Sequence, residues 1–113
     1  MKIKTSELTG AALDWAVAKC LGVDYISFLN MHQCGHFHFS TDWAEGGPII
    51  EREKISVIHM EGTQHWIAML FKPTADTTPK SEGPLIAAMR CYCCSKLGDE
   101  IDIPEELCQQ QNS

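Results

Sequence analysis

Two segments of helical periodicity, each ended by a glycine, constrain most strongly what this chain can fold into. The first runs from Thr9 to Leu21, where Thr9 can cap the helix and Gly22 can end it. The second runs from Pro84 to Leu97, because proline is favoured at a first helical position and Gly98 follows as the stop. Each segment carries an apolar stripe that must pack against another element.

A β-hairpin is predicted between these helices. Ile55 to Met60 and His65 to Phe71 have the composition of strands, with Gly62-Thr63 at the centre of a type II′ turn. His59 then lies opposite Trp66. Both faces of the hairpin are mostly apolar, so we expect a helix to cover one face and a loop or a partner subunit to cover the other. The pattern therefore points to a homo-oligomer.

These elements predict an α+β fold, with two helices packed on a small, mostly antiparallel sheet. We expect a single globular domain over residues 1–108 and a frayed C-terminal tail over 109–113. Residues Tyr25 to Leu29 fit either a strand or a helical turn, and His36 to Phe39 alternate like a strand. The remaining expectations are a polar connection over Lys72 to Glu82, a short edge strand over Asp99 to Ile103, and core positions for Trp15, Trp43 and Trp66.

Composition excludes several classes of function. The chain has 113 residues and a formal net charge of −6, which argues against a nucleic-acid polymer as the partner. No apolar stretch is long enough to span a membrane, and the first residues lack the pattern of a signal peptide, so we expect an intracellular protein. Acidic residues form a negative patch late in the chain, which can be a solvated face or a binding surface: Asp99, Glu100, Asp102, Glu105 and Glu106.

The segment Thr41 to Glu53 has the composition of a recognition loop. Glycines permit positive φ and close approach of a ligand, and an exposed indole can stack on a flat ring. We predict that ligand binding is shared by Asp42, Trp43, Gly46, Gly47 and Arg52. In this scheme the indole stacks, the glycine amides and the guanidinium bind an anion, and the carboxylate accepts from a hydroxyl or an amine. The alternative is structural, with the indole as a lid on the core and the carboxylate as a turn cap.

Two further clusters favour structure over chemistry. His32, Cys34, His36 and His38 alternate, but residues two apart on a strand are separated by about 6.6 Å, so one zinc ion could take only an adjacent pair. Whether this strand binds metal is left open, and neither a metal nor a cofactor is expected. The cysteines at 91, 93 and 94 fall late in a helix, where the dipole does not activate a thiol, so they fit close packing. No catalytic motif is present, and we expect no enzyme activity.

Four segments resemble the NinX-like proteins of lambdoid phages. They are Ser6 to Cys20, Ser40 to Glu53, Pro84 to Tyr92 and Ser95 to Glu100, which together cover about half of the chain. The resemblance implies an accessory protein in the cytoplasm of an infected host bacterium, and it implies no particular biochemical activity. The segment Gln33 to Phe39 departs from the family pattern, so the resemblance assigns no role to its histidines.

Two functions follow as expectations. The first is a non-enzymatic phage accessory protein that binds and sequesters a small nucleotide-like ligand, a host immune signal, and thereby counters host defence. The alternative is a protein-interaction module that inhibits a host protein through its acidic surface.

Overall fold

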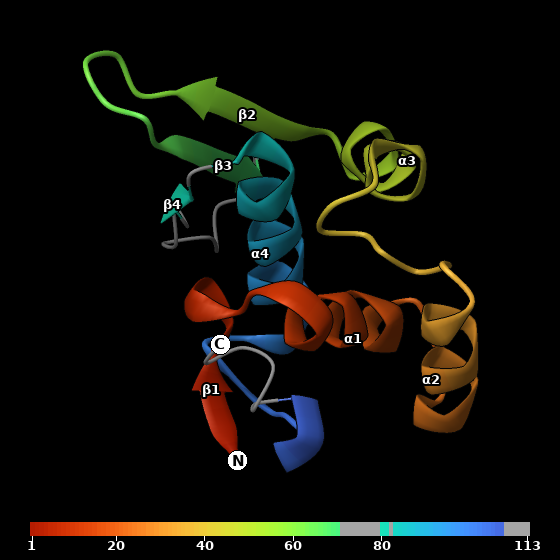
Figure 1. The fold of residues 1–113 in the computed structure, drawn as a ribbon. Helices are drawn as coiled ribbons and strands as arrows, with labels where there is room; N and C mark the ends of the chain where they lie inside the picture. Colours follow the sequence, from red (N-terminus) through yellow and green to blue (C-terminus); the bar gives the residue numbers. More distant parts are fainter. Residues whose placement is uncertain (71–79, 82, 108–113) are drawn as a thin grey trace.

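The computed structural model describes residues 1–70, 80–81 and 83–107, and its elements surround one central helix. This helix is α4 (Pro84–Leu97), which packs against α1 (Gly10–Cys20), α3 (Trp43–Glu53) and the strands of the hairpin (Figure 1). Helix α2 (Tyr25–Gln33) packs on α1, away from α4 in the same view. The predicted tail over 109–113 and most of the predicted connection over 72–82 lie outside the described residues.

The α+β class and both framing helices are confirmed. Thr9 is the N-cap residue of α1 and Pro84 begins α4, with Gly98 ending it at φ 82°. Most of α4 is buried around its circumference, which is the burial expected of a central helix. Leu8, just before the N-cap of α1, and Leu13, on α1, are both fully buried, as a hydrophobic staple at a helix start requires.

The hairpin is confirmed in its register and corrected in its turn. Strands β2 (Ile55–His59) and β3 (Trp66–Leu70) pair antiparallel, with His59 opposite Trp66, and the two-residue strand β4 (Lys80–Ser81) pairs with β3. The turn closes one residue earlier than predicted, because the amide of Thr63 donates to the carbonyl of Met60 at 3.1 Å. Glycine therefore takes the second central position of this turn, at φ 81°, and the type II′ turn does not form.

Only one face of the hairpin is covered by the described part of the chain. Ile55, Ala68 and Leu70 are buried on the side of α4. The opposite side, called here the outer hairpin face, consists of Ser56, Ile58, Ile67 and Met69, and Ile58 is 46% exposed there. The prediction that both faces are covered is therefore confirmed for the face that packs on α4. For the outer hairpin face it stays a prediction.

A second, two-stranded sheet joins the two ends of the described chain. Strand β1 (Lys2–Lys4) pairs antiparallel with β5 (Glu100–Asp102), so the predicted edge strand exists and its partner is an N-terminal strand that the sequence pattern did not predict. A 3-10 turn, η1 (Thr5–Glu7), leads from β1 toward α1. Cross-strand neighbours place Lys2 opposite Asp102 and Lys4 opposite Glu100.

The loop prediction for Thr41 to Glu53 was wrong, and of the two alternatives for Tyr25 to Leu29 the helical one is confirmed. Tyr25–Gln33 forms α2, whose N-cap residue Asp24 accepts from the amide of Ser27 at 3.0 Å. The predicted recognition loop forms α3 although Pro48 lies inside the helix. Residues His36 to Phe39 form no strand. They lie in the irregular segment that joins Gln33, at the end of α2, to Trp43, at the start of α3, and this segment is called here the link. Of the three tryptophans, Trp15 is buried and Trp66 packs beside the core, but Trp43 is 55% exposed.

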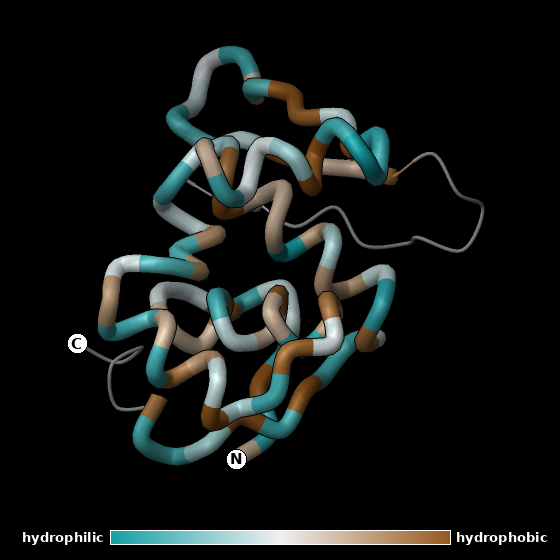
Figure 2. The backbone as a smooth tube through the Cα atoms, turned by 90° about the vertical axis from the view of Figure 1, so that its right-hand side faces the viewer, coloured by the Kyte–Doolittle hydropathy of each residue, from teal (hydrophilic) through white to brown (hydrophobic). Residues whose placement is uncertain are grey.

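The core is built from most of α1 and α4 and from a few residues of other elements. Fully buried side chains come from α1, α2, α4 and the segments beside them, and the largest are Phe28, Leu8, Leu13, Met89 and Ile103. Figure 2, which colours the backbone by hydropathy, shows apolar positions spread along the whole described trace. No single segment supplies the core, which is the arrangement expected of one cooperative domain.

Candidate functional site

The predicted ligand residues lie on and before α3, where most of their polar groups already have partners. Asp42 is the N-cap residue, and its carboxylate accepts from the amide of Ala44 at 2.9 Å. The amide of Gly46 donates to the carbonyl of Asp42 at 2.9 Å, as the first turn of a helix requires. The structural reading of Asp42 as a local cap is therefore confirmed.

The indole and the guanidinium do not converge. Trp43 and Arg52 stand at opposite ends of α3, about 13.5 Å apart along the axis and about half a turn apart around it. Arg52 donates from Nε to Glu53 at 3.0 Å and from Nη2 to the hydroxyl of Tyr92 at 3.4 Å. One small ligand cannot contact both side chains in this arrangement. Whether any of the five residues binds a ligand stays a prediction.

The two glycines have different surroundings. A Cβ atom at Gly46 would lie 2.5 Å from the carbonyl oxygen of Phe39 and 2.6 Å from Leu85, so the bare backbone lets α3 approach α4 closely. Gly47 faces outward, and a Cβ atom there would be 3.9 Å from the ring of Trp43. The structure also has a hollow of about 330 Å³, but its described lining is Lys4, Thr5, Ser6, Cys94, Asp99 and Glu100. None of the five predicted residues is in that lining.

A buried carboxylate forms a different polar centre, between α1 and the link that precedes α3. Asp14 lies on α1 with its side chain only 3% exposed. Its Oδ1 accepts from the amide of Ser40 at 2.9 Å, and its Oδ2 lies 2.9 Å from Nε2 of His32. A buried carboxylate requires such partners, because its desolvation is otherwise costly. The carboxylate of Asp14 therefore holds the link against α1 through the amide of Ser40.

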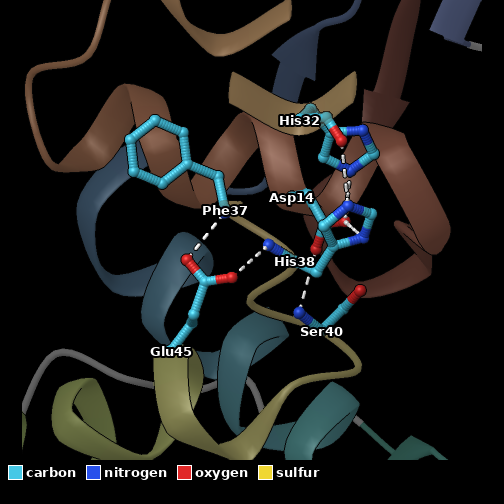
Figure 3. A network of polar contacts seen from close by, with 6 residues as sticks. All are labelled: Asp14, His32, Phe37, His38, Ser40 and Glu45. Atoms are coloured by element: carbon cyan, nitrogen blue, oxygen red, sulfur yellow. Dashed lines mark hydrogen bonds and ion pairs between the residues drawn. The ribbon is translucent and has the colours of Figure 1, made fainter. Parts of the chain in front are cut away.

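Two imidazoles complete this centre, from the end of α2 and from the link (Figure 3). The rings of His32 and His38 stack with centroids 3.9 Å apart and planes 19° apart. Nε2 of His38 is 3.1 Å from the carbonyl oxygen of His32, and its Nδ1 is 4.0 Å from Oδ2 of Asp14. Because a carbonyl only accepts, Nε2 of His38 carries the hydrogen, and Nδ1 of the neutral ring is an acceptor.

Glu45 holds the link from the opposite side. Its carboxylate accepts from the amide of Phe37 at 2.6 Å and from the amide of His38 at 3.1 Å (Figure 3). Phe37 has a φ of 60°, a left-handed conformation that is unfavourable for an aromatic residue and persists only where neighbours impose it. The backbone on either side of His38 is therefore fixed by two carboxylates, one from α1 and one from α3.

The histidine and cysteine predictions have separate outcomes. The predicted strand over His32 to His38 is wrong: Cys34 and His36 are exposed, and His32 and His38 meet through the bend of the link. The packing interpretation of the later cysteines agrees with the structure. Cys91 is buried, and burial raises the pKa of its thiol to about 11, which leaves it protonated and unreactive at neutral pH.

Basic groups interrupt the acidic C-terminal patch. Lys2 and Lys4 lie opposite its carboxylates on β1, and the N-terminal amine donates to Asp102 at 2.7 Å. The amine also holds the pKa of Asp102 below its ordinary value. Glu106 accepts a hydrogen bond from the hydroxyl of Tyr25. This face is therefore mixed in charge over β1 and β5.

The architecture is that of a small α+β domain with a polar centre of one buried carboxylate and two half-buried imidazoles beside α1. A family model described as "Bacteriophage P22, NinX" matches residues 4–96. The chain therefore belongs to this phage protein family, as the resemblance of its segments indicated. No curated protein matches the chain. Among the described residues, no helix is both long enough and apolar enough to cross a membrane.

Sequence reasoning missed Asp14, although its carboxylate lies beside both histidines and joins them in one polar centre. Asp14 occupies a position on α1 that is flanked by buried residues, and the helical pattern alone gave it no partner. The available signal was a carboxylate on an otherwise apolar face, because a charge is rarely buried there without a partner. Finding that partner required the path of the link, which the sequence pattern placed on a strand.

Proposed function

We propose that this phage accessory protein is non-enzymatic and acts by binding a host protein, with the exposed face of α3 as the contact surface. The observation that carries the proposal is the 55% exposure of Trp43 on a helix, where an indole normally turns inward. Tryptophan and arginine are the residues most enriched among binding hot spots. The exposed residues of this face are Trp43, Ala44, Pro48, Glu51 and Arg52.

Shape favours a protein over a small molecule at this surface. Small ligands are bound in concave sites that bury most of their area, whereas the outer side of a helix is convex. The indole and the guanidinium stand about 13.5 Å apart along α3 and at opposite edges of its exposed face, a spread that a protein surface can span and a small ligand cannot. The acidic face is a weaker candidate, because lysines of β1 lie opposite two of its carboxylates. A nucleotide-like ligand and a role against host defence stay predictions.

Affinity capture followed by a measured dissociation constant tests the proposal. The immobilised chain is exposed to host lysate, a captured protein is purified, and its affinity is compared for wild type, Trp43→Ala and Ile26→Ala. We expect Trp43→Ala to weaken binding about 30-fold, the effect of losing a hot spot worth about 2 kcal/mol. Ile26→Ala is the matched control, because Ile26 is an exposed apolar side chain on α2, at 65%.

Two results contradict the proposal. The first is equal affinity of the partner for wild type and Trp43→Ala. The second is a rise in melting temperature with cyclic or ADP-ribose-type nucleotides that Trp43→Ala abolishes, which supports the small-ligand prediction instead. At a ligand concentration 100 times Kd the stabilisation is about 2.7 kcal/mol, which a thermal shift detects readily.

A further inference from the structure

We propose that Asp14, His32 and His38 form a binding site for a divalent first-row transition metal, with zinc as the ion to test. The site is distinct from the exposed face of α3. It draws one ligand from α1, one from the end of α2 and one from the link before α3. Imidazole nitrogens favour zinc and its neighbours, whereas calcium and magnesium prefer oxygen ligands alone.

The spacing of the donor atoms suits one ion. One ligand atom from each of the three residues lies within 4.8 Å of the other two. Zinc bonds of about 2.0–2.2 Å in tetrahedral geometry place neighbouring donors about 3.3 Å apart. The distances from Oδ2 of Asp14 to Nε2 of His32 and to Nδ1 of His38 are 2.9 Å and 4.0 Å, on either side of that value. These two donor pairs therefore lie within about 1 Å of the tetrahedral spacing, and the third pair, between the two histidines, lies within 4.8 Å.

For Asp14 and His38, the atom that does not face the centre is already held by a partner. Nε2 of His38 donates to the carbonyl of His32, which leaves the lone pair of Nδ1 free on the side of Asp14. Oδ1 of Asp14 accepts from the amide of Ser40, which leaves Oδ2 as the ligand atom. Histidine ligands of metals characteristically donate their second nitrogen to a carbonyl or carboxylate in this way.

An unpartnered hydroxyl beside the centre is an independent indication of a ligand. Oγ of Ser40 is buried and has no hydrogen-bond partner among the described residues, although Ser40 is only 3% exposed. Buried hydroxyls without a partner are rare, because their desolvation is uncompensated. In Figure 3 this hydroxyl lies on the side of Ser40 nearer to His38. A water molecule bound to the metal in a fourth position can accept from it or donate to it.

Metal binding requires one ring to leave the stack. The rings of His32 and His38 are nearly parallel, and an imidazole bonds a metal within its own plane, so one ion cannot lie in both planes as they stand. His38 is the ring that can tilt, because its side chain is 34% exposed, and the tilt lengthens its hydrogen bond to the carbonyl of His32. The ion then fixes the link to α1. The amide of Asp42 donates to the carbonyl of His38 at 2.8 Å, so this bond carries the constraint to the start of α3.

Metal content and metal-dependent stability test the site on the full chain, without a histidine tag. Protein dialysed against zinc is measured by elemental analysis, and isothermal titration with zinc gives the stoichiometry. We expect one equivalent of zinc and a rise in melting temperature of at least about 5 °C in excess zinc. Cobalt substitution provides a spectroscopic check, because a tetrahedral site with nitrogen and oxygen ligands gives visible absorption without an intense thiolate band.

Variants locate the bound ion. His38→Ala and Asp14→Asn should each reduce zinc to below about 0.2 equivalents, and the second retains an acceptor for the amide of Ser40. His36→Ala and Cys34→Ser are the matched controls, because both residues are exposed neighbours outside the cluster. Circular dichroism of each variant confirms that it is folded. Zinc absent from folded wild type, zinc retained in His38→Ala, or zinc lost in either control overturns the proposal.

Discussion

At the scale of single residues, Gly46 shows how a missing side chain sets the distance between two helices. The backbone of α3 approaches the carbonyl of Phe39 and the side chain of Leu85 more closely than a Cβ atom permits. Sequence reasoning assigned the same glycine to ligand binding, because glycine serves both close packing and close approach of a ligand. One of the two packing partners, Leu85, comes from a distant segment and has no local signature.

Gly46→Ala should therefore destabilise the protein by about 1–3 kcal/mol, because the carbonyl that a Cβ atom meets cannot move cheaply. The free energy of unfolding in urea measures the effect. Gly47→Ala is the matched control on the same helix, where a Cβ atom meets only ordinary contact. It should stabilise the protein by about 0.5–1 kcal/mol through helix propensity. Equal effects at both positions would show that α3 does not pack as described.

At the scale of elements, the carboxylate of Asp24 helps to define where α2 begins. Its pKa lies below the ordinary value of 3.8, because the amide and then the hydroxyl of Ser27 donate to the charged form. A lowered pKa in the folded state means that the unfolded state takes up a proton first as the pH falls. The contribution of this cap is therefore present above the ordinary pKa and is lost as the pH falls through the folded pKa.

Asp24→Ala should lower the free energy of unfolding at about pH 7, and the difference from wild type should shrink toward about pH 3. Urea unfolding at both pH values measures the two differences. Glu51→Ala removes an exposed carboxylate from α3 and should change stability little at either pH. If the free energy of unfolding of Asp24→Ala differed from that of wild type by the same amount at both pH values, the assignment of Asp24 as this cap would be contradicted.

Elements with local boundary signals were predictable, and elements stabilised by distant contacts were not. Thr9 and Gly22 bound α1, and Pro84 and Gly98 bound α4, so their sequences specify them directly. Helix α3 contains two glycines and a proline, each unfavourable inside a helix, and its formation depends on burial of Ile49 and Gly46. The β1–β5 pair joins residues about 100 positions apart, and no local pattern encodes that pairing.

At the scale of the whole molecule, the outer hairpin face is the apolar surface that the described chain leaves open. Ile58 and Ile67 are directly opposite each other across β2 and β3, and Ile58 is 46% exposed. Homo-oligomer formation stays a prediction, which this open face supports. Ile58→Lys should shift the species observed by light scattering to the monomer mass, whereas Ile26→Ala should not change it. A monomeric wild type at high concentration would contradict the prediction.

The Asp14 centre connects these scales, because one carboxylate joins two helices and the link that leads to Trp43. Long-range proton–nitrogen spectra of the histidine rings test it most directly, since they identify which ring nitrogen carries hydrogen. In metal-free protein we predict hydrogen on Nε2 of His38, and on adding zinc a coordination shift at Nδ1 of the same ring. Hydrogen on Nδ1 of His38, or a ring that responds to zinc only as exposed His36 does, would contradict both the geometry and the metal site.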